Sequence, residues 1–306
     1  MIDTKMKDFM AGFLKGLGFD PETADLKFAD RNNKLDDIIT FSMPAGHSCP
    51  FAKDCRSCAT LKAARSTNTV SQNHKFSGFG IQDGPHTEFR CFTAIDEVLR
   101  PGVRAARWHN FLTLLHVLTK GKQATVLLIE RSLPVARWGK PTRVHVAGDF
   151  FTQKYFDAWM DVARRNPTRL FYAYTKALPF WVKRLGTIPN NFKLTASYGG
   201  THDWMIEKYN LRFAKVVKSV QEAADLGLAL DHDDSHAYGD GGSFALLVHG
   251  QQPAGSVWAK AWASLKKLGI GGYGKTKNAT KTAGAKSVST GVPASRLGLD
   301  ILKRNK

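Results

Sequence analysis

The 306-residue chain has few cysteines, a shortage of acidic residues and no long apolar run. Four cysteines are too few for the dense disulfide framework of a small secreted protein. No stretch of about eighteen apolar residues occurs, so we expect no membrane-spanning helix and no membrane partner. The N-terminus lacks the uninterrupted apolar segment of a signal peptide. These absences predict a cytoplasmic protein.

The shortage of acidic residues leaves a strongly basic chain. There are 44 Lys and Arg residues against 26 Asp and Glu, which gives a net charge of +18. Such an excess attracts polyanions, so nucleic acid is a candidate partner through the basic surface. Residues 271–306 are basic and rich in Gly, Ser, Thr and Ala, which predicts a flexible tail that contributes to this contact.

The pattern of apolar residues predicts an α/β fold. Apolar residues recur at helical spacing near the start, which indicates an N-terminal helical segment within residues 1–34. Within residues 35–270, predicted strands alternate with predicted helices, which is typical of βαβ units and a parallel sheet. We expect a complete or partial (β/α) barrel like that of triosephosphate isomerase (TIM), with a cysteine cluster loop after its first strand at 35–43. An open parallel sheet is the alternative.

Several local predictions accompany this architecture. Pro101 is expected to divide residues 93–119 into two helices, because proline cannot continue a helix. Thr152 is expected to cap a helix, and Ser219 to open another in a capping box with Glu222. We also expect a strand over residues 143–150 and, because of its glycines, a loop over residues 76–92.

Polar side chains follow several predicted strands. His145 and Asp149 lie in one such segment, Lys176 ends the next strand, and an acidic stretch precedes a later one. Because parallel strands end at a shared edge, we expect these groups on one rim as candidate catalytic residues. Ordinary explanations compete: a core histidine, an aspartate at a helix start, and a lysine in a salt bridge. The acidic stretch consists of Asp231, His232, Asp233 and Asp234.

This acidic stretch, which continues to His236 as DHDDSH, permits two interpretations. Closely spaced carboxylates and histidine suit a hard metal ion such as Mg²⁺, Mn²⁺ or Fe²⁺. The alternative is a solvated acidic loop.

The cysteines carry the most specific signal. Cys49, Cys55 and Cys58 lie in one short loop, and Cys91 follows at a distance. In a reducing compartment, clustered cysteines are more often metal ligands or redox groups than disulfides. Three cysteines on a compact loop and a fourth cysteine at a distance are typical of iron–sulfur clusters. Structural zinc sites usually combine two short Cys-x2–4-Cys motifs. We therefore predict a [4Fe–4S] cluster on all four cysteines, with zinc, or buried thiols without metal, as alternatives.

Five segments carry a further signal: CPFAKDC, RVHVAGDFFTQKYFDAW, LFYAYTKALP, LDHDDS and SFALLVHGQQPAGS. They resemble segments of the phage gene product 88 family, and the resemblance covers roughly residues 35–270. It implies a virus-encoded protein in the cytoplasm of the infected host cell, and it implies no particular reaction.

The expected position of the cysteine loop is similar to that in radical S-adenosylmethionine enzymes, a likeness of architecture only. Their usual motif is Cys-x3-Cys-x2-Cys, whereas here the first gap is five residues and Cys91 is available as a fourth ligand. If Cys91 ligates, no iron remains free for that cofactor. The sequence thus favours a phage iron–sulfur protein with a redox or structural role. The alternatives are a zinc-stabilised nucleic-acid-binding protein and a radical S-adenosylmethionine-like enzyme.

Overall fold

The computed structural model describes residues 3–30, 38–63, 76–135 and 139–270. The predicted tail at 271–306 therefore lies outside the described residues. Ten helices are described: α1 (Thr4–Gly16), α2 (Phe92–Leu99), α3 (Pro101–Thr119), α4 (Lys122–Ser132), α5 (Gln153–Arg165), α6 (Leu178–Val182), α7 (Trp204–Lys208), α8 (Val220–Asp225), α9 (Ser235–Tyr238) and α10 (Val257–Lys267). None of them combines the length and apolar character needed to cross a bilayer.

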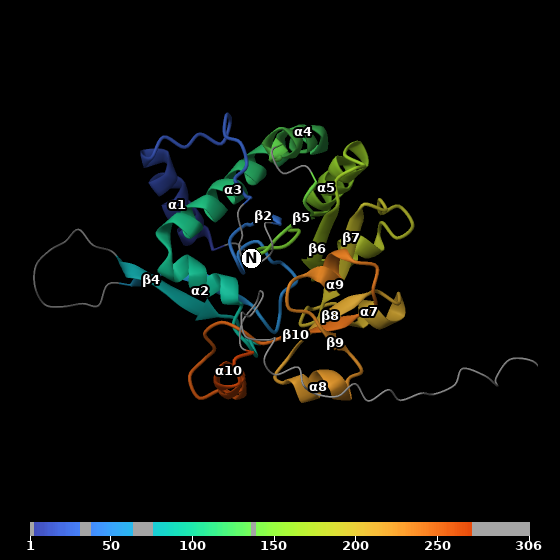
Figure 1. Cartoon of the computed structure of the whole chain (residues 1–306). Coiled ribbons are helices and arrows are strands. Elements are labelled where there is room, and N and C mark those ends of the chain that lie inside the picture. The colour runs from blue at the N-terminus through green and yellow to red at the C-terminus, as the bar shows by residue number, and fades with distance from the viewer. Residues whose placement is uncertain (1–2, 31–37, 64–75, 136–138, 271–306) are drawn as a thin grey trace, which may run out of the picture.

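An eight-stranded sheet forms the centre of the fold, in the order β1-β2-β5-β6-β7-β8-β10-β9 (Figure 1). Only β1 and β2 pair antiparallel, and all other neighbours are parallel. The strands are β1 (Phe28–Ala29), β2 (Ile39–Phe41), β5 (Thr142–Arg143), β6 (Phe171–Thr175), β7 (Phe192–Ser197), β8 (Phe213–Val217), β9 (Ala229–Leu230) and β10 (Phe244–Leu247). The predicted α/β class is confirmed. Among the described residues the strand order has two ends, β1 and β9, so no closed barrel is found.

The local signals of the sequence act as expected at several helix ends. Thr152 Oγ1 accepts a hydrogen bond from the backbone N–H of Tyr155 at 3.2 Å and begins α5. Ser219 Oγ accepts from the N–H of Glu222 at 3.1 Å and begins α8. Pro101 begins α3 directly after α2 ends, which confirms the predicted break.

Two sequence predictions are wrong. Part of the expected loop at 76–92 is a strand, β4 (Phe76–Asp83), which pairs antiparallel with β3 (Ser57–Ala63). This hairpin is separate from the main sheet and lies beside α2 (Figure 1). The expected strand at 143–150 is reduced to β5, because His145 (φ 71°) and Gly148 (φ 85°) adopt left-handed conformations that interrupt a ladder.

The two faces of the sheet pack against different elements. Phe171 of β6 contributes to the main core together with Trp159 of α5, with ring centroids 6.0 Å apart. The next residue, Tyr172, points to the opposite face and packs with Ala237 of α9. This alternation follows from the two-residue period of a strand. The sheet therefore lies between α5 and its neighbours on one side and the short α9 on the other.

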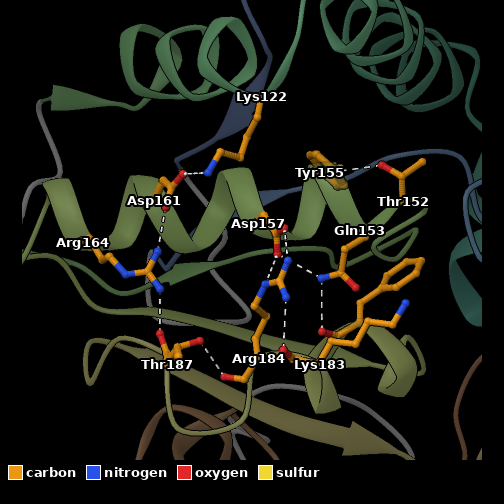
Figure 2. Close-up of polar contacts among 11 residues, drawn as sticks. Lys122, Thr152, Gln153, Tyr155, Asp157, Asp161, Arg164, Lys183, Arg184 and Thr187 are labelled. Carbon is orange, nitrogen blue, oxygen red and sulfur yellow. Dashed lines mark hydrogen bonds and ion pairs between the residues drawn. The ribbon is translucent and has the colours of Figure 1, made fainter.

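Polar contacts hold α5 to its neighbours on the outside of the fold (Figure 2). Arg184, which follows α6, donates from Nε and Nη2 to the carboxylate of Asp157 on α5, at 2.8 and 2.6 Å. Asp161, one turn further on, pairs with Lys122 of α4 at 2.6 Å. Exposed pairs of this kind add little stability individually, so the position of α5 depends mainly on its buried face.

Candidate functional site

A cavity of about 160 Å³ lies at the carboxyl ends of the parallel strands. Thr175 and Lys176 at the end of β6 and Ser197 at the end of β7 form part of its wall. Apolar side chains of β8, β10 and the residues that follow contribute another part, namely Val216, Leu246 and Val248. The cavity therefore occupies the position at which α/β proteins bind ligands.

Three of the four cysteines line this cavity: Cys49, Cys55 and Cys91. Cys49 lies in the segment that follows β2, whereas Cys91 is the N-cap residue of α2. Cys58 is absent from the lining and lies on β3, opposite Gln82 of β4. The structure thus brings together three cysteines from two distant segments and places the fourth in a neighbouring hairpin.

Burial raises the pKa values of two of the cavity thiols, Cys49 and Cys55. Burial raises the pKa of Cys49 well above its usual range, and the charges of Asp149, Cys91 and Cys55 raise it further. Burial likewise raises the pKa of Cys55 to about 11, although the nearby ammonium of Lys176 opposes the shift. Thiolates at these positions would repel one another without a positive centre between them. A metal centre bound to these thiols would supply that compensation, because a coordinating thiol is deprotonated.

The cavity thiols are not grouped around the position of a single metal ion. Within the described residues, no three His, Cys, Asp or Glu side chains are close enough to hold one metal ion. In a cluster each thiolate binds a different iron, so the sulfur atoms stand farther apart than around one zinc. The aromatic residues Phe89 and Phe92 flank Cys91 and line the same cavity, where they can limit access of solvent.

A buried glutamate connects the two cysteine-bearing segments. Glu97 Oε1 of α2 accepts from the backbone N–H of Ala45, which precedes the cysteine loop, and from Arg107 of α3, both at 2.8 Å. Burial raises the pKa of Glu97, and Arg107 opposes that shift. The sequence analysis missed this residue. No local pattern could identify it, because its partners come from other elements.

Asp149 and Lys176 both line the cavity, as expected for residues at a common rim. Asp149 accepts three hydrogen bonds: from the Thr175 hydroxyl at 2.6 Å and from the backbone N–H groups of Phe150 and Lys176 at 2.7 and 2.8 Å. Burial raises its pKa, whereas these donors lower it. The carboxylate therefore joins the end of β6 to the segment that follows β5. Lys176 Nζ donates to the carbonyl and the hydroxyl of Ser197.

His145 also lines the cavity, and its backbone conformation is unusual for a residue other than glycine. Its side chain is buried, and Nε2 lies 3.0 Å from the hydroxyl of Tyr155. Burial lowers the pKa of His145 to about 3, and the charge of Arg143 contributes. The imidazole is therefore neutral at physiological pH. Strained residues of this kind are concentrated at functional sites, where surrounding structure holds them in place.

The acidic stretch does not line the cavity. Asp231 and Asp234 are buried, whereas His232 is exposed. Asp233 Oδ1 accepts a hydrogen bond from the N–H of Ser235, the first residue of α9. Asp234 accepts hydrogen bonds from Arg143, Tyr172 and Tyr174, at 2.7, 2.8 and 2.9 Å. Arg143 and Tyr174 themselves line the cavity, so the carboxylate of Asp234 lies behind its wall. Arg143 was missed from sequence, because its partner lies 91 residues further on.

A family model named gene product 88 matches residues 20–268 of the chain. The match covers most of the sequence, including every residue of the cavity and the acidic stretch. The chain therefore belongs to the phage gene product 88 family. No curated protein and no solved structure matches it.

Proposed function

We propose that this member of the phage gene product 88 family is an iron–sulfur protein that holds one cluster in its cavity. Cys49, Cys55 and Cys91 are the ligands in this proposal. The observation that carries it is the meeting of these three thiols, from two segments of the chain, in one cavity at the edge of a parallel sheet. Such a cluster supplies one-electron transfer or holds the two segments together.

The chain's own residues prepare this site. Glu97 holds the cysteine loop against α2, and Asp149 holds the end of β6 against the segment after β5. The neutral imidazole of His145 and the ammonium of Lys176 face the same space as the thiols. The potential of such a cluster depends on nearby charge and on hydrogen bonds to its sulfur atoms, so these residues would set it.

The proposal also concerns the fold, which we interpret as an incomplete barrel. Parallel strands from β2 to β10 with intervening helices resemble an incomplete (β/α) barrel with the cluster at its mouth. Cys58 stands outside this mouth, so three cysteines rather than four are the proposed ligands. One iron of a four-iron cluster would then lack a cysteine, which is the feature shared with radical S-adenosylmethionine enzymes. Fold analogy alone does not assign that reaction.

Purification without oxygen, from an expression host supplied with iron, tests the proposal. We expect a brown protein with equal amounts of iron and acid-labile sulfide and an electron paramagnetic resonance signal after reduction. A colourless protein that contains one zinc per chain would instead support the zinc alternative. A protein with neither metal would reject both.

A further inference from the structure

Three Lys or Arg side chains line the cavity, and they differ in how their charge is compensated. Arg90 pairs with Asp83 at 2.7 Å, and Arg143 pairs with Asp234 at 2.7 Å. Lys176 is buried, and within the described residues no carboxylate lies at ion-pair distance from its ammonium. A buried charge without a directly bound counter-ion is costly, so an anion in the cavity would stabilise this ammonium.

Asp149 lines the same cavity as Lys176, but its carboxylate already accepts hydrogen bonds from other groups. Its two oxygens already accept three hydrogen bonds, from Thr175, Phe150 and the backbone of Lys176. Asp149 therefore attracts the ammonium through space but does not bind it directly. The ammonium donates to Ser197 alone among the described residues, at 3.2 Å to its carbonyl and 2.5 Å to its hydroxyl.

Two donor hydrogens remain at this point. An ammonium has three, and two of them contact Ser197, so one is left. The Ser197 hydroxyl accepts from Lys176, so its own hydrogen is available to an acceptor. Two adjacent donors, one of them charged, match the two oxygens of a carboxylate.

The remaining wall limits the rest of the ligand. Val216, Leu246 and Val248 supply an apolar surface in the same cavity. A volume of about 160 Å³ is well below the roughly 300 Å³ at which pockets for drug-sized molecules begin. We propose that the cavity binds a small monocarboxylate, with its carboxylate on Lys176 and Ser197 and its apolar body against these three side chains.

Butyrate is the probe, with butyramide as its uncharged match. Both are titrated into the full-length protein with ¹³C-labelled Val and Leu methyl groups, and iron content is measured separately. We expect saturable shifts at Val216, Leu246 and Val248 with butyrate, and at least tenfold weaker binding of butyramide. The carboxylate and the proposed cluster would occupy the same cavity, so the titration is made on protein without iron. If protein purified without oxygen contains no iron and still binds butyrate, this inference stands while the iron–sulfur proposal fails.

Variants of Lys176 and Ser197 test whether these two residues bind the carboxylate. Lys176→Met should weaken butyrate binding at least tenfold, whereas Lys183→Met, at an exposed lysine after α6, should leave it unchanged. Ser197→Ala keeps the ammonium of Lys176 and should weaken butyrate binding severalfold. If Lys176→Met does not fold, the Ser197→Ala variant serves as the test. Equal binding of butyrate and butyramide, no saturable binding, or wild-type affinity in the folded Lys176 or Ser197 variant would overturn the inference.

Discussion

The carboxylate of Asp234 lies 2.7 Å from the guanidinium of Arg143, and both side chains are buried. Asp234 adopts a left-handed backbone conformation directly before α9. Because Arg143 also lines the cavity, this pair connects the acidic stretch to the site without placing the acid inside it. This charge compensation accounts for the burial of Asp234.

Replacing Asp234 with asparagine should destabilise the protein strongly. Asparagine keeps the size and tolerates the left-handed backbone, but it removes the carboxylate charge that faces the buried guanidinium of Arg143. Loss of one member of a buried pair costs about 3 kcal/mol or more. Urea unfolding measures the change. Asp240→Asn, at an exposed partner of Lys193, is the control, and it should change the free energy of unfolding far less. Equal losses in the two variants would contradict this account of the acidic stretch.

The pKa of His145 predicts a pH dependence of stability. Its pKa is about 3 in the folded protein, against 6.5 ordinarily, so below pH 6.5 the unfolded chain takes up a proton that the folded protein does not. The free energy of unfolding should therefore fall as pH decreases from about 6.5 towards 3, by up to about 1.4 kcal/mol per pH unit.

His145→Asn isolates this contribution, since asparagine also tolerates a positive φ. The raised pKa values of Asp149 and Glu97 act in the opposite sense, because burial favours their protonated forms, but both are present in wild type and variant. Urea unfolding at several pH values should give a flatter profile for the variant. Parallel profiles would show that His145 does not carry the effect.

Gly148 positions the segment that carries Asp149 against the cysteine loop. A Cβ at this position would lie 2.5 Å from Ser48 Oγ and 2.9 Å from Met43 Cβ, and φ is 85°. Gly255 has a similar φ of 78° with open space around it. Gly148→Ala should therefore cost about 1–3 kcal/mol more than Gly255→Ala in urea unfolding, since only the first adds overpacking to backbone strain. Equal costs would indicate that the close approach is relieved by movement.

The basic segment 271–306 lies beyond the family match, which ends at residue 268. It carries eight Lys or Arg residues against the single acid Asp300. If this segment contacts nucleic acid, its deletion should lower the salt concentration at which the protein elutes from DNA–agarose, because fewer counterions are released on binding. Unchanged elution would assign any DNA contact to residues 1–270 or reject it.

Much of the fold follows from local signals in the sequence. The alternation of strands and helices, the caps at Thr152 and Ser219 and the break at Pro101 all depend on residues close together in the chain. The gathering of His145, Asp149 and Lys176 also follows, because parallel strands end at one edge.

Other features depend on long-range contacts that no local pattern contains. The glycines near residue 80 suggest a loop, but pairing with β3 makes this segment a strand. That pairing also removes Cys58 from the cavity lining, although it is only three residues from Cys55. The role of Asp234 depends on Arg143, 91 residues away.

The number of irons held by two cysteine variants tests the central claim most directly. Cys91→Ala and Cys58→Ala are purified without oxygen beside the wild type, and iron and sulfide are measured per folded chain. We predict that Cys91→Ala loses the cluster, whereas Cys58→Ala, which alters a thiol outside the cavity lining, retains wild-type content. Retention in Cys91→Ala, or loss only in Cys58→Ala, would contradict a cluster held by the three cavity thiols.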